Sequence, residues 1–247
     1  MERKGRGWRS GSTNWVLRGK YNMLDDNDIE KYLALIKKSK AENRNVQREA
    51  SSNSPISSIM IDPTCDVRGI ERMRFGENVV IQKDCWLNIA FNNPAPGPMI
   101  VIDEGSNIGR RCTISAANKI MIGKFVLIAP NVFIADTHHE YQKLGIPIMH
   151  QGITTHDDQI TIGDETWIGI NAVIIGNVKV GKHCVIGANS VVNKDIPDYC
   201  VAVGNPAKVV RAFDVKTGQW VKVQGKADLD RYLAVRSELL SEDSAKS

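Results

Sequence analysis

The 247-residue sequence lacks long apolar stretches, a strong net charge and closely paired cysteines. No apolar run approaches the roughly 20 residues that a membrane-spanning helix needs, so we expect no integral membrane segment. The net charge of +4 is too small to indicate a nucleic-acid-binding protein by itself. The basic N-terminus has no apolar segment behind it and so is unlike a secretory signal. These absences lead us to expect a cytoplasmic protein that does not bind nucleic acid.

The five cysteines do not form the close pairs that disulfide frameworks and zinc knuckles require. Four of them, Cys65, Cys85, Cys112 and Cys184, stand two residues before an aliphatic residue of the repeat described below. That position calls for a small residue that points into a core. We therefore expect reduced, buried thiols rather than a catalytic nucleophile.

What the sequence does contain is a repeat of six residues, clearest between residues 162 and 193. Aliphatic residues stand six apart there, at Ile162, Ile168, Ile174, Val180, Ile186 and Val192. A small or modest residue stands two positions before each of them, and glycine follows four of them. This period fits neither an amphipathic helix nor an open alternating sheet. It predicts a parallel β-helix, an all-β fold in which the aliphatic residues point inward and the glycines relieve the backbone near the corners.

The same register extends back to Ile61, with three hexapeptides to each coil. Within a coil the spacing is six, and every longer step falls between the third aliphatic residue of one coil and the first of the next. All inserted loops should therefore leave one edge of a triangular prism. The longest, residues 135–161, holds four of the five histidines: His138, His139, His150 and His156. Loops of this length in a compact domain are usually functional or disordered, so we place the candidate site here.

The chain divides into three parts around this repeat. Residues 1–55 are interpreted as a basic arm, a short N-terminal helix and a polar linker. Residues 56–212 form the predicted β-helix domain with its long loop 135–161. Residues 213–247 are expected to give a hairpin, turning at Thr217–Gly218, and a C-terminal helix with an apolar stripe.

The repeats, the segment NVFIADTHHEY and the closing segment VVNKDIPDYCVAVGNPAKVVR resemble the hexapeptide-repeat acetyltransferases. The resemblance is strongest to galactoside and maltose O-acetyltransferases and to their polysaccharide-modifying relatives, and it covers roughly residues 60–212. It implies a left-handed parallel β-helix, a homotrimer, acetyl-CoA as the donor and no metal. The handedness comes from the resemblance alone, because spacing cannot show it.

On the acceptor side, the resemblance implies that His139 is the general base and that Asn88, which follows Leu87, helps to place the acceptor hydroxyl. Polysaccharide-modifying relatives often carry an Asp-His-x-His pattern. Here the four residues 136–139 read Asp-Thr-His-His, so the first histidine of that pattern is replaced by Thr137.

On the donor side, the resemblance implies that Trp167 lines the tunnel for the donor and that Ala188 offers a backbone contact to the pantetheine arm. Three basic residues match positions near the anionic end of CoA: Lys194, Lys208 and Arg211. Each alone would be an ordinary surface charge, so their interest depends on the matched positions.

Acetyl transfer from a thioester to a hydroxyl is limited by the weak nucleophilicity of the hydroxyl. A neutral imidazole that removes its proton accelerates such a step by roughly 10²- to 10⁴-fold, and histidine has a pKa suited to this task. We therefore interpret the protein as an acetyl-CoA-dependent O-acetyltransferase acting on a saccharide hydroxyl, in a surface polysaccharide or its precursor. Loop residues suited to sugar binding, Trp86 and Tyr141 among them, favour this acceptor.

Three alternatives stay open. An N-acetyltransferase for an amino sugar or an amino acid could use the same histidine. A trimeric scaffold could bind glycans without catalysis. A metal enzyme like the γ-type carbonic anhydrases would need three histidines in fixed register, and only His183 lies inside a coil.

Overall fold

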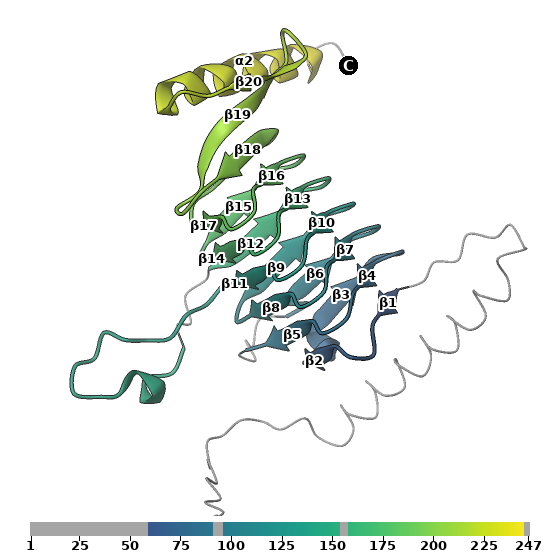
Figure 1. Ribbon diagram of the computed structural model, residues 1–247, viewed down its shortest axis with the longest axis vertical. Helices are drawn as coiled ribbons and strands as arrows, with labels where there is room; N and C mark the ends of the chain where they lie inside the picture. Colours follow the sequence, from purple (N-terminus) through teal and green to yellow (C-terminus); the bar gives the residue numbers. More distant parts are fainter. Residues whose placement is uncertain (1–58, 91–95, 154–157, 245–247) are drawn as a thin grey trace, which may run out of the picture.

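In the computed structural model the described residues, 59–90, 96–153 and 158–244, form a three-sided prism of stacked coils, capped at one end by a hairpin and a helix (Figure 1). The N-terminal arm and helix expected in residues 1–55 lie outside the described residues, as does His156. Among the described residues, no helix has the length and apolar character needed to cross a membrane.

Three parallel sheets form the walls of the prism, which we call faces A, B and C. Face A contains β1 (Met60–Ile61), β4 (Val80–Ile81), β7 (Asn107–Ile108), β10 (Leu127–Ile128), β13 (Trp167–Ile168), β16 (Val185–Ile186) and β18 (Cys200–Val203). Face B contains β2 (Asp66–Arg68), β5 (Trp86–Ile89), β8 (Thr113–Ala116), β11 (Phe133–Ala135), β14 (Val173–Ile175) and β17 (Val191–Val192). Face C contains β3 (Met73–Phe75), β6 (Ile100–Ile102), β9 (Lys119–Ile122), β12 (Gln159–Ile162) and β15 (Val178–Val180). The chain visits faces C, A and B in turn, as a left-handed parallel β-helix, which confirms the predicted fold.

The aliphatic residues of the repeat form the core, in the register that the spacing predicted. On face A, Ile108 lies between Ile81 and Ile128, and on face B, Ile134 lies between Ile114 and Ile174. These side chains are buried, and burying each isoleucine contributes roughly 1.5–3 kcal/mol. The in-phase repeat therefore supplies one continuous core along the prism.

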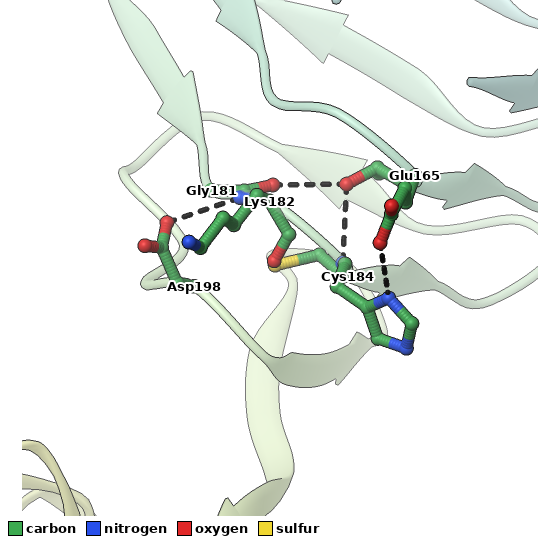
Figure 2. A network of polar contacts seen from close by, with 7 residues as sticks. Glu165, Gly181, Lys182, Cys184 and Asp198 are labelled. Atoms are coloured by element: carbon green, nitrogen blue, oxygen red, sulfur yellow. Dashed lines mark hydrogen bonds and ion pairs between the residues drawn. The ribbon is translucent and has the colours of Figure 1, made fainter. Parts of the chain in front are cut away.

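The small residues two positions before the aliphatic ones also link one coil to the next. The Thr166 hydroxyl donates to the Gly181 carbonyl (2.9 Å) and accepts from the Cys184 N–H (3.1 Å). The Cys184 thiol in turn donates to the Pro197 carbonyl (3.0 Å), and Figure 2 shows this region. All five cysteines are free and buried, and this confirms the prediction made for Cys65, Cys85, Cys112 and Cys184. All five side chains fill the core, and the thiols of these four also donate to backbone carbonyls, a role that the sequence did not indicate.

The corners of the prism use left-handed backbone at residues other than the repeat glycines. Asn131, Asn171 and Asn189 have φ values of 60°, 58° and 57°, and asparagine tolerates this conformation better than most residues. Their amides form a ladder along the corner between faces A and B, with 3.0 Å between successive side chains.

The expectation that the repeat glycines relieve the backbone at corners is wrong. None of the four glycines that follow a repeat aliphatic residue, Gly163, Gly169, Gly181 and Gly187, has a left-handed φ. A Cβ on Gly163 would instead lie 2.5 Å from the backbone nitrogen of Lys182 in the next coil. Glycine is needed there because successive coils approach closely.

Every insertion leaves the edge between faces B and C, which we call the loop edge. The order of the strands confirms this prediction, because each longer connection runs from a face B strand to the next face C strand. One such connection contains the 3-10 helix η1 (Ile70–Arg72), and the long loop contains η2 (Ile148–His150). Figure 1 shows the long loop extending away from the prism beyond β11.

The C-terminal segment closes the end of the prism. Regular pairing continues past Val192 to Ala202, which lies beside Ile186. The antiparallel strands β19 (Lys208–Asp214) and β20 (Gln219–Lys222) then extend face A, and helix α2 (Lys226–Ser244) follows. Arg236 of α2 is buried and donates to the carbonyls of Asp198 and Phe213, which fixes the helix on the last coil.

Candidate active site

Asp136 fixes the point where the long loop leaves the prism. It directly follows β11, and the residue is only 1% exposed. Its two oxygens accept hydrogen bonds from the backbone N–H groups of Ala117 (2.6 Å), Asn118 (2.9 Å) and Lys119 (2.6 Å). Burial raises the pKa of Asp136, while these N–H donors stabilise its charged form and oppose that rise. The carboxylate thus ties the start of the loop to the turn between β8 and β9.

His139 stands three residues beyond this anchor and is exposed. It forms an isolated antiparallel bridge with Ile153 on the returning limb of the loop. Its Nδ1 lies 3.3 Å from the carbonyl oxygen of Gly152, which can only accept a hydrogen bond. This contact favours the tautomer with the proton on Nδ1, and that tautomer leaves the lone pair of Nε2 available as a base.

The outer part of the loop is held by one side-chain amide. Gln151 accepts from the Lys143 N–H (3.0 Å) and donates to the carbonyls of Lys143 (2.9 Å) and Ile146 (2.8 Å). The side chains around this tie all face solvent, including those of Leu144 (97% exposed) and Met149 (71% exposed). The loop therefore has defined geometry and presents apolar side chains outward.

Asn88 lies on β5 at the same edge. Its Nδ2 donates to the Ser115 hydroxyl (3.1 Å) on β8, and Ser115 is only 8% exposed. Ser115 pairs in turn with Ala135, the residue before Asp136. Asn88 is thus two coils below the start of the long loop, or about 10 Å along the prism at about 4.8 Å per coil. The bond to Ser115 orients the amide so that its oxygen is available to a ligand.

Most of the residues predicted for the donor lie elsewhere on the prism, whereas Lys194 lies at the loop edge, between face B and the bridge of Ile196 to face C. Trp167 is on face A and half exposed, and Ala188 is exposed at the corner between faces A and B. Lys194 follows β17, whereas Lys208 and Arg211 belong to β19, and all three are exposed. The structure therefore places His139 and Asn88 at one edge and does not bring Trp167 or Ala188 to that edge within one chain.

Comparison with known proteins places this arrangement in a family. The model for the bacterial transferase hexapeptide (six repeats) matches residues 159–194. Galactoside O-acetyltransferase from Lactococcus lactis is 30% identical over 161 residues, which are 64% of this chain and 72% of that protein. The chain belongs to the hexapeptide-repeat acetyltransferase family.

Two further relatives define the extent of the likeness. A probable acetyltransferase from Mycobacterium tuberculosis is 31% identical over 176 residues, which are 68% of this chain but only 58% of that protein. The crystal structure of a mutant of AntD, an N-acyltransferase from Bacillus cereus, superposes with a TM-score of 0.53 over 75% of this chain and 89% of that one. At 18% identity, this second match supports the fold alone.

Two polar residues of this member of the hexapeptide-repeat family were assigned no role from the sequence. In the sequence, Ser115 is an ordinary residue that follows a repeat isoleucine. Asp136 is the first residue of the Asp-Thr-His-His segment, in which Thr137 replaces the expected histidine. Their importance depends on which backbone groups they meet in the neighbouring coil. The one available signal was the position of Asp136, two residues after the last inward isoleucine before the long loop. Within the described residues, no cluster of histidine, cysteine and acidic side chains could hold a metal ion.

Proposed function

We propose that this protein transfers an acetyl group from acetyl-CoA to a hydroxyl of a saccharide, with His139 as the general base. The observation that carries the proposal is the loop itself: a buried carboxylate fixes its root, and a backbone carbonyl orients the imidazole of His139. The family relationship and the galactoside O-acetyltransferase among the relatives support this reaction class.

In the proposed reaction, Nε2 of His139 takes the proton of the acceptor hydroxyl as its oxygen attacks the thioester carbonyl. A carbon–oxygen bond forms, the tetrahedral intermediate collapses, and the carbon–sulfur bond breaks. The thiolate of CoA leaves and receives the proton from His139. The Nδ1–H bond to Gly152 stabilises the imidazolium that exists between these steps. General-base assistance of this kind contributes roughly 10²- to 10⁴-fold.

Asn88 would position the acceptor. Because its Nδ2 is engaged by Ser115, its Oδ1 is the group that can accept a hydrogen bond from a sugar hydroxyl. Holding the acceptor and the thioester together supplies a large part of the rate enhancement in such two-substrate reactions.

The donor site would form between two copies of the chain, within a homotrimer. Trp167 and Ala188 would line the path of the pantetheine arm, and Lys194, Lys208 and Arg211 would meet the phosphates. Trp167 and Ala188 lie away from the loop edge in one chain, which supports a site that a second copy completes. Two faces of the prism carry exposed apolar side chains suited to such contact: Leu127 (51% exposed) and Trp167 (50%) on face A, and Trp86 and Phe133 (39% each) on face B. The apolar side chains of the long loop offer further contact area.

The test is to incubate the purified protein with labelled acetyl-CoA and a panel of saccharides, amino sugars and amino acids. We expect release of CoA thiol to be fastest with saccharides that lack an amine, and the labelled product to be lost in mild base, as an ester is. A fastest acceptor that is a primary amine, with a base-stable product, would contradict O-acetylation. Light scattering on the same sample should give the mass of a trimer, and a monomer at micromolar concentration would contradict the shared site.

A further inference from the structure

An open hollow lies on face C beside the loop edge, outside the residues assigned so far. Its volume is about 380 Å³, and its lining residues come from β12, β15 and the two connections next to them: Gln159, Thr161, Asn177, Val178, Lys179 and Asp195. Figure 1 shows β12 and β15 side by side on the prism. The volume falls within the roughly 300–1,000 Å³ of small-molecule sites.

The hollow lies close to the root of the long loop. Gln159 pairs with Lys119, whose N–H is bound by Asp136, so the hollow begins one coil above this anchor. One coil corresponds to about 4.8 Å. On its other side, Gly176 precedes Asn177 and donates its N–H to the Ala135 carbonyl (3.2 Å). The hollow therefore lies at the root of the loop that carries His139.

The lining is fixed by two bonds to the backbone, and these bonds leave other polar atoms facing outward. Asn177 Oδ1 accepts from the Gln159 N–H (3.2 Å), and Asp195 Oδ1 accepts from the Lys179 N–H (2.8 Å). The remaining groups are the Asn177 amide nitrogen, the second oxygen of Asp195, the Thr161 hydroxyl and the Lys179 ammonium. Both donors and acceptors therefore line one space, as recognition of sugar hydroxyls requires, since each hydroxyl both donates and accepts.

The charges of the hollow argue for a neutral ligand. Lys179 and Asp195 are both exposed at its wall and oppose each other in sign. A phosphate group would be attracted by Lys179 but repelled by Asp195. A free ammonium group would be attracted by Asp195 but repelled by Lys179. A neutral, hydroxyl-rich unit can use both side chains without an unpaired charge.

We propose that this hollow is a second saccharide subsite, which binds a unit of the acceptor glycan next to the unit that is acetylated. This inference rests on the proposed function and sharpens it, because it makes the acceptor an oligosaccharide or polysaccharide rather than a single sugar. The subsite adds binding energy away from the reacting hydroxyl, so it lowers KM for longer acceptors.

The experiment compares acceptors of increasing length with the full chain: glucose, maltose and maltotriose in one series, and galactose, galactobiose and galactotriose in another. We expect KM to fall by about tenfold or more from the monosaccharide to the trisaccharide in the preferred series, or about 1.4 kcal/mol. Lys179→Met removes a donor from the hollow, and Thr161→Trp fills it. Both variants should abolish the gain with length and leave kcat/KM for the monosaccharide unchanged.

Lys182→Met is the matched control, because Lys182 is an exposed lysine at the corner between faces C and A. This variant should keep the gain with length. Transfer to sugars with no dependence on length, or a dependence that survives both hollow variants, would overturn the subsite while leaving the proposed function intact.

If no sugar is acetylated, the proposed function fails and the subsite is tested by itself. Maltotriose and galactotriose are then titrated into the protein, and the side-chain amide signals of Gln159 and Asn177 are followed by NMR. Shifts that are lost in Thr161→Trp support the subsite. The subsite is overturned if neither trisaccharide shifts these signals at about 10 mM. That concentration is well above a Kd of about 1 mM, which corresponds to a binding free energy of about −4.1 kcal/mol.

Discussion

The coils and the long loop of this protein are built by different physical means. In the coils, isoleucines such as Ile108 and Ile174 are fully buried, and every strand in the middle of a face pairs on both sides. In the loop, residues 141–150 are all exposed, and the geometry depends on a few polar ties, chiefly those of Asp136 and Gln151. The coils therefore carry the stability, whereas the loop can change in sequence and keep its position as long as those ties remain.

His139 gives the largest expected effect and separates the two regions most clearly. His139→Ala should lower turnover by at least about 10²-fold, because the general base is lost. Its midpoint of urea unfolding should match that of the unchanged protein, because the side chain is exposed. Initial rates of CoA release and urea titrations measure the two quantities. His138→Ala is the matched control and should retain most activity; if it abolishes turnover while His139→Ala does not, the register assigned to the loop is wrong by one residue.

Ile108 provides the opposite case, a change in the coils on a face away from the long loop. Ile108→Ala should lower the free energy of unfolding by about 2–5 kcal/mol, since it leaves a cavity in a filled core. The rate per folded molecule should stay close to that of the unchanged protein under conditions where the variant is folded. A loss of less than about 1 kcal/mol in urea titrations would mean that the core relaxes around the cavity and that the coils are less tightly packed than described.

Asp136 connects the two regions, and its replacement should affect both moderately. In Asp136→Asn the amide has one acceptor oxygen for three N–H donors, and leaving buried donors unpaired costs about 1–3 kcal/mol. We expect turnover to fall about tenfold, with KM for acetyl-CoA unchanged and faster hydrogen exchange in the loop, because the base is less well positioned. Asp164→Asn is the control: Asp164 also accepts a backbone N–H, from Lys124 (2.8 Å), but away from the loop edge. Equal effects of both variants on kcat would show that Asp136 has no special influence on the loop.

The buried thiols give the smallest effect near neutral pH, because their contribution changes only in alkaline solution, and this effect concerns the coils alone. Burial raises the pKa of Cys184 to about 11, above the usual thiol pKa of about 8.5. The folded protein therefore favours the protonated thiol. The contribution of this thiol to the free energy of unfolding is fully present below its pKa in the unfolded chain, and it is lost as the pH rises toward 11. Cys184→Ser keeps a hydroxyl donor for Pro197 and cannot titrate in this range. The unchanged protein should lose about 2–3 kcal/mol more than this variant between pH 8.5 and 11, and identical pH profiles would contradict the assigned pKa.

The sequence predicts the coils well because their signal is periodic. Burial demands an aliphatic residue at each inward position, so the spacing of Ile162, Ile168 and Ile174 reveals both the strands and the edge from which loops leave. The corners were harder to predict, because the residues that adopt a left-handed φ there are ones such as Asn131 and His183 rather than the repeat glycines. The glycines proved to mark close approach between coils, which depends on atoms far away in the sequence.

The candidate site was less predictable, since its residues act through partners in other coils. His139 and Asn88 came from a family resemblance, and their roles remain proposals. Nothing in the sequence states that Asp136 meets the N–H groups of residues 117–119, or that Ser115 orients Asn88, because these pairings require the register between coils. The hollow beside Lys179 and Asp195 likewise exists only once β12 and β15 are adjacent.

The central claim is that the loop of one chain and the coils of another form a single acetyl-transfer site, and mixing two inactive variants tests it most directly. His139→Ala lacks the base, and Ala188→Trp blocks the proposed donor path on the neighbouring copy. After unfolding and refolding an equal mixture, half of the loops and half of the partner surfaces are intact, so about one quarter of the sites in a cyclic trimer should be complete. We predict recovery of about one quarter of the original rate from two variants that are inactive alone. The shared site would be contradicted if the mixture stays inactive although masses intermediate between those of the two pure trimers show that the subunits have exchanged.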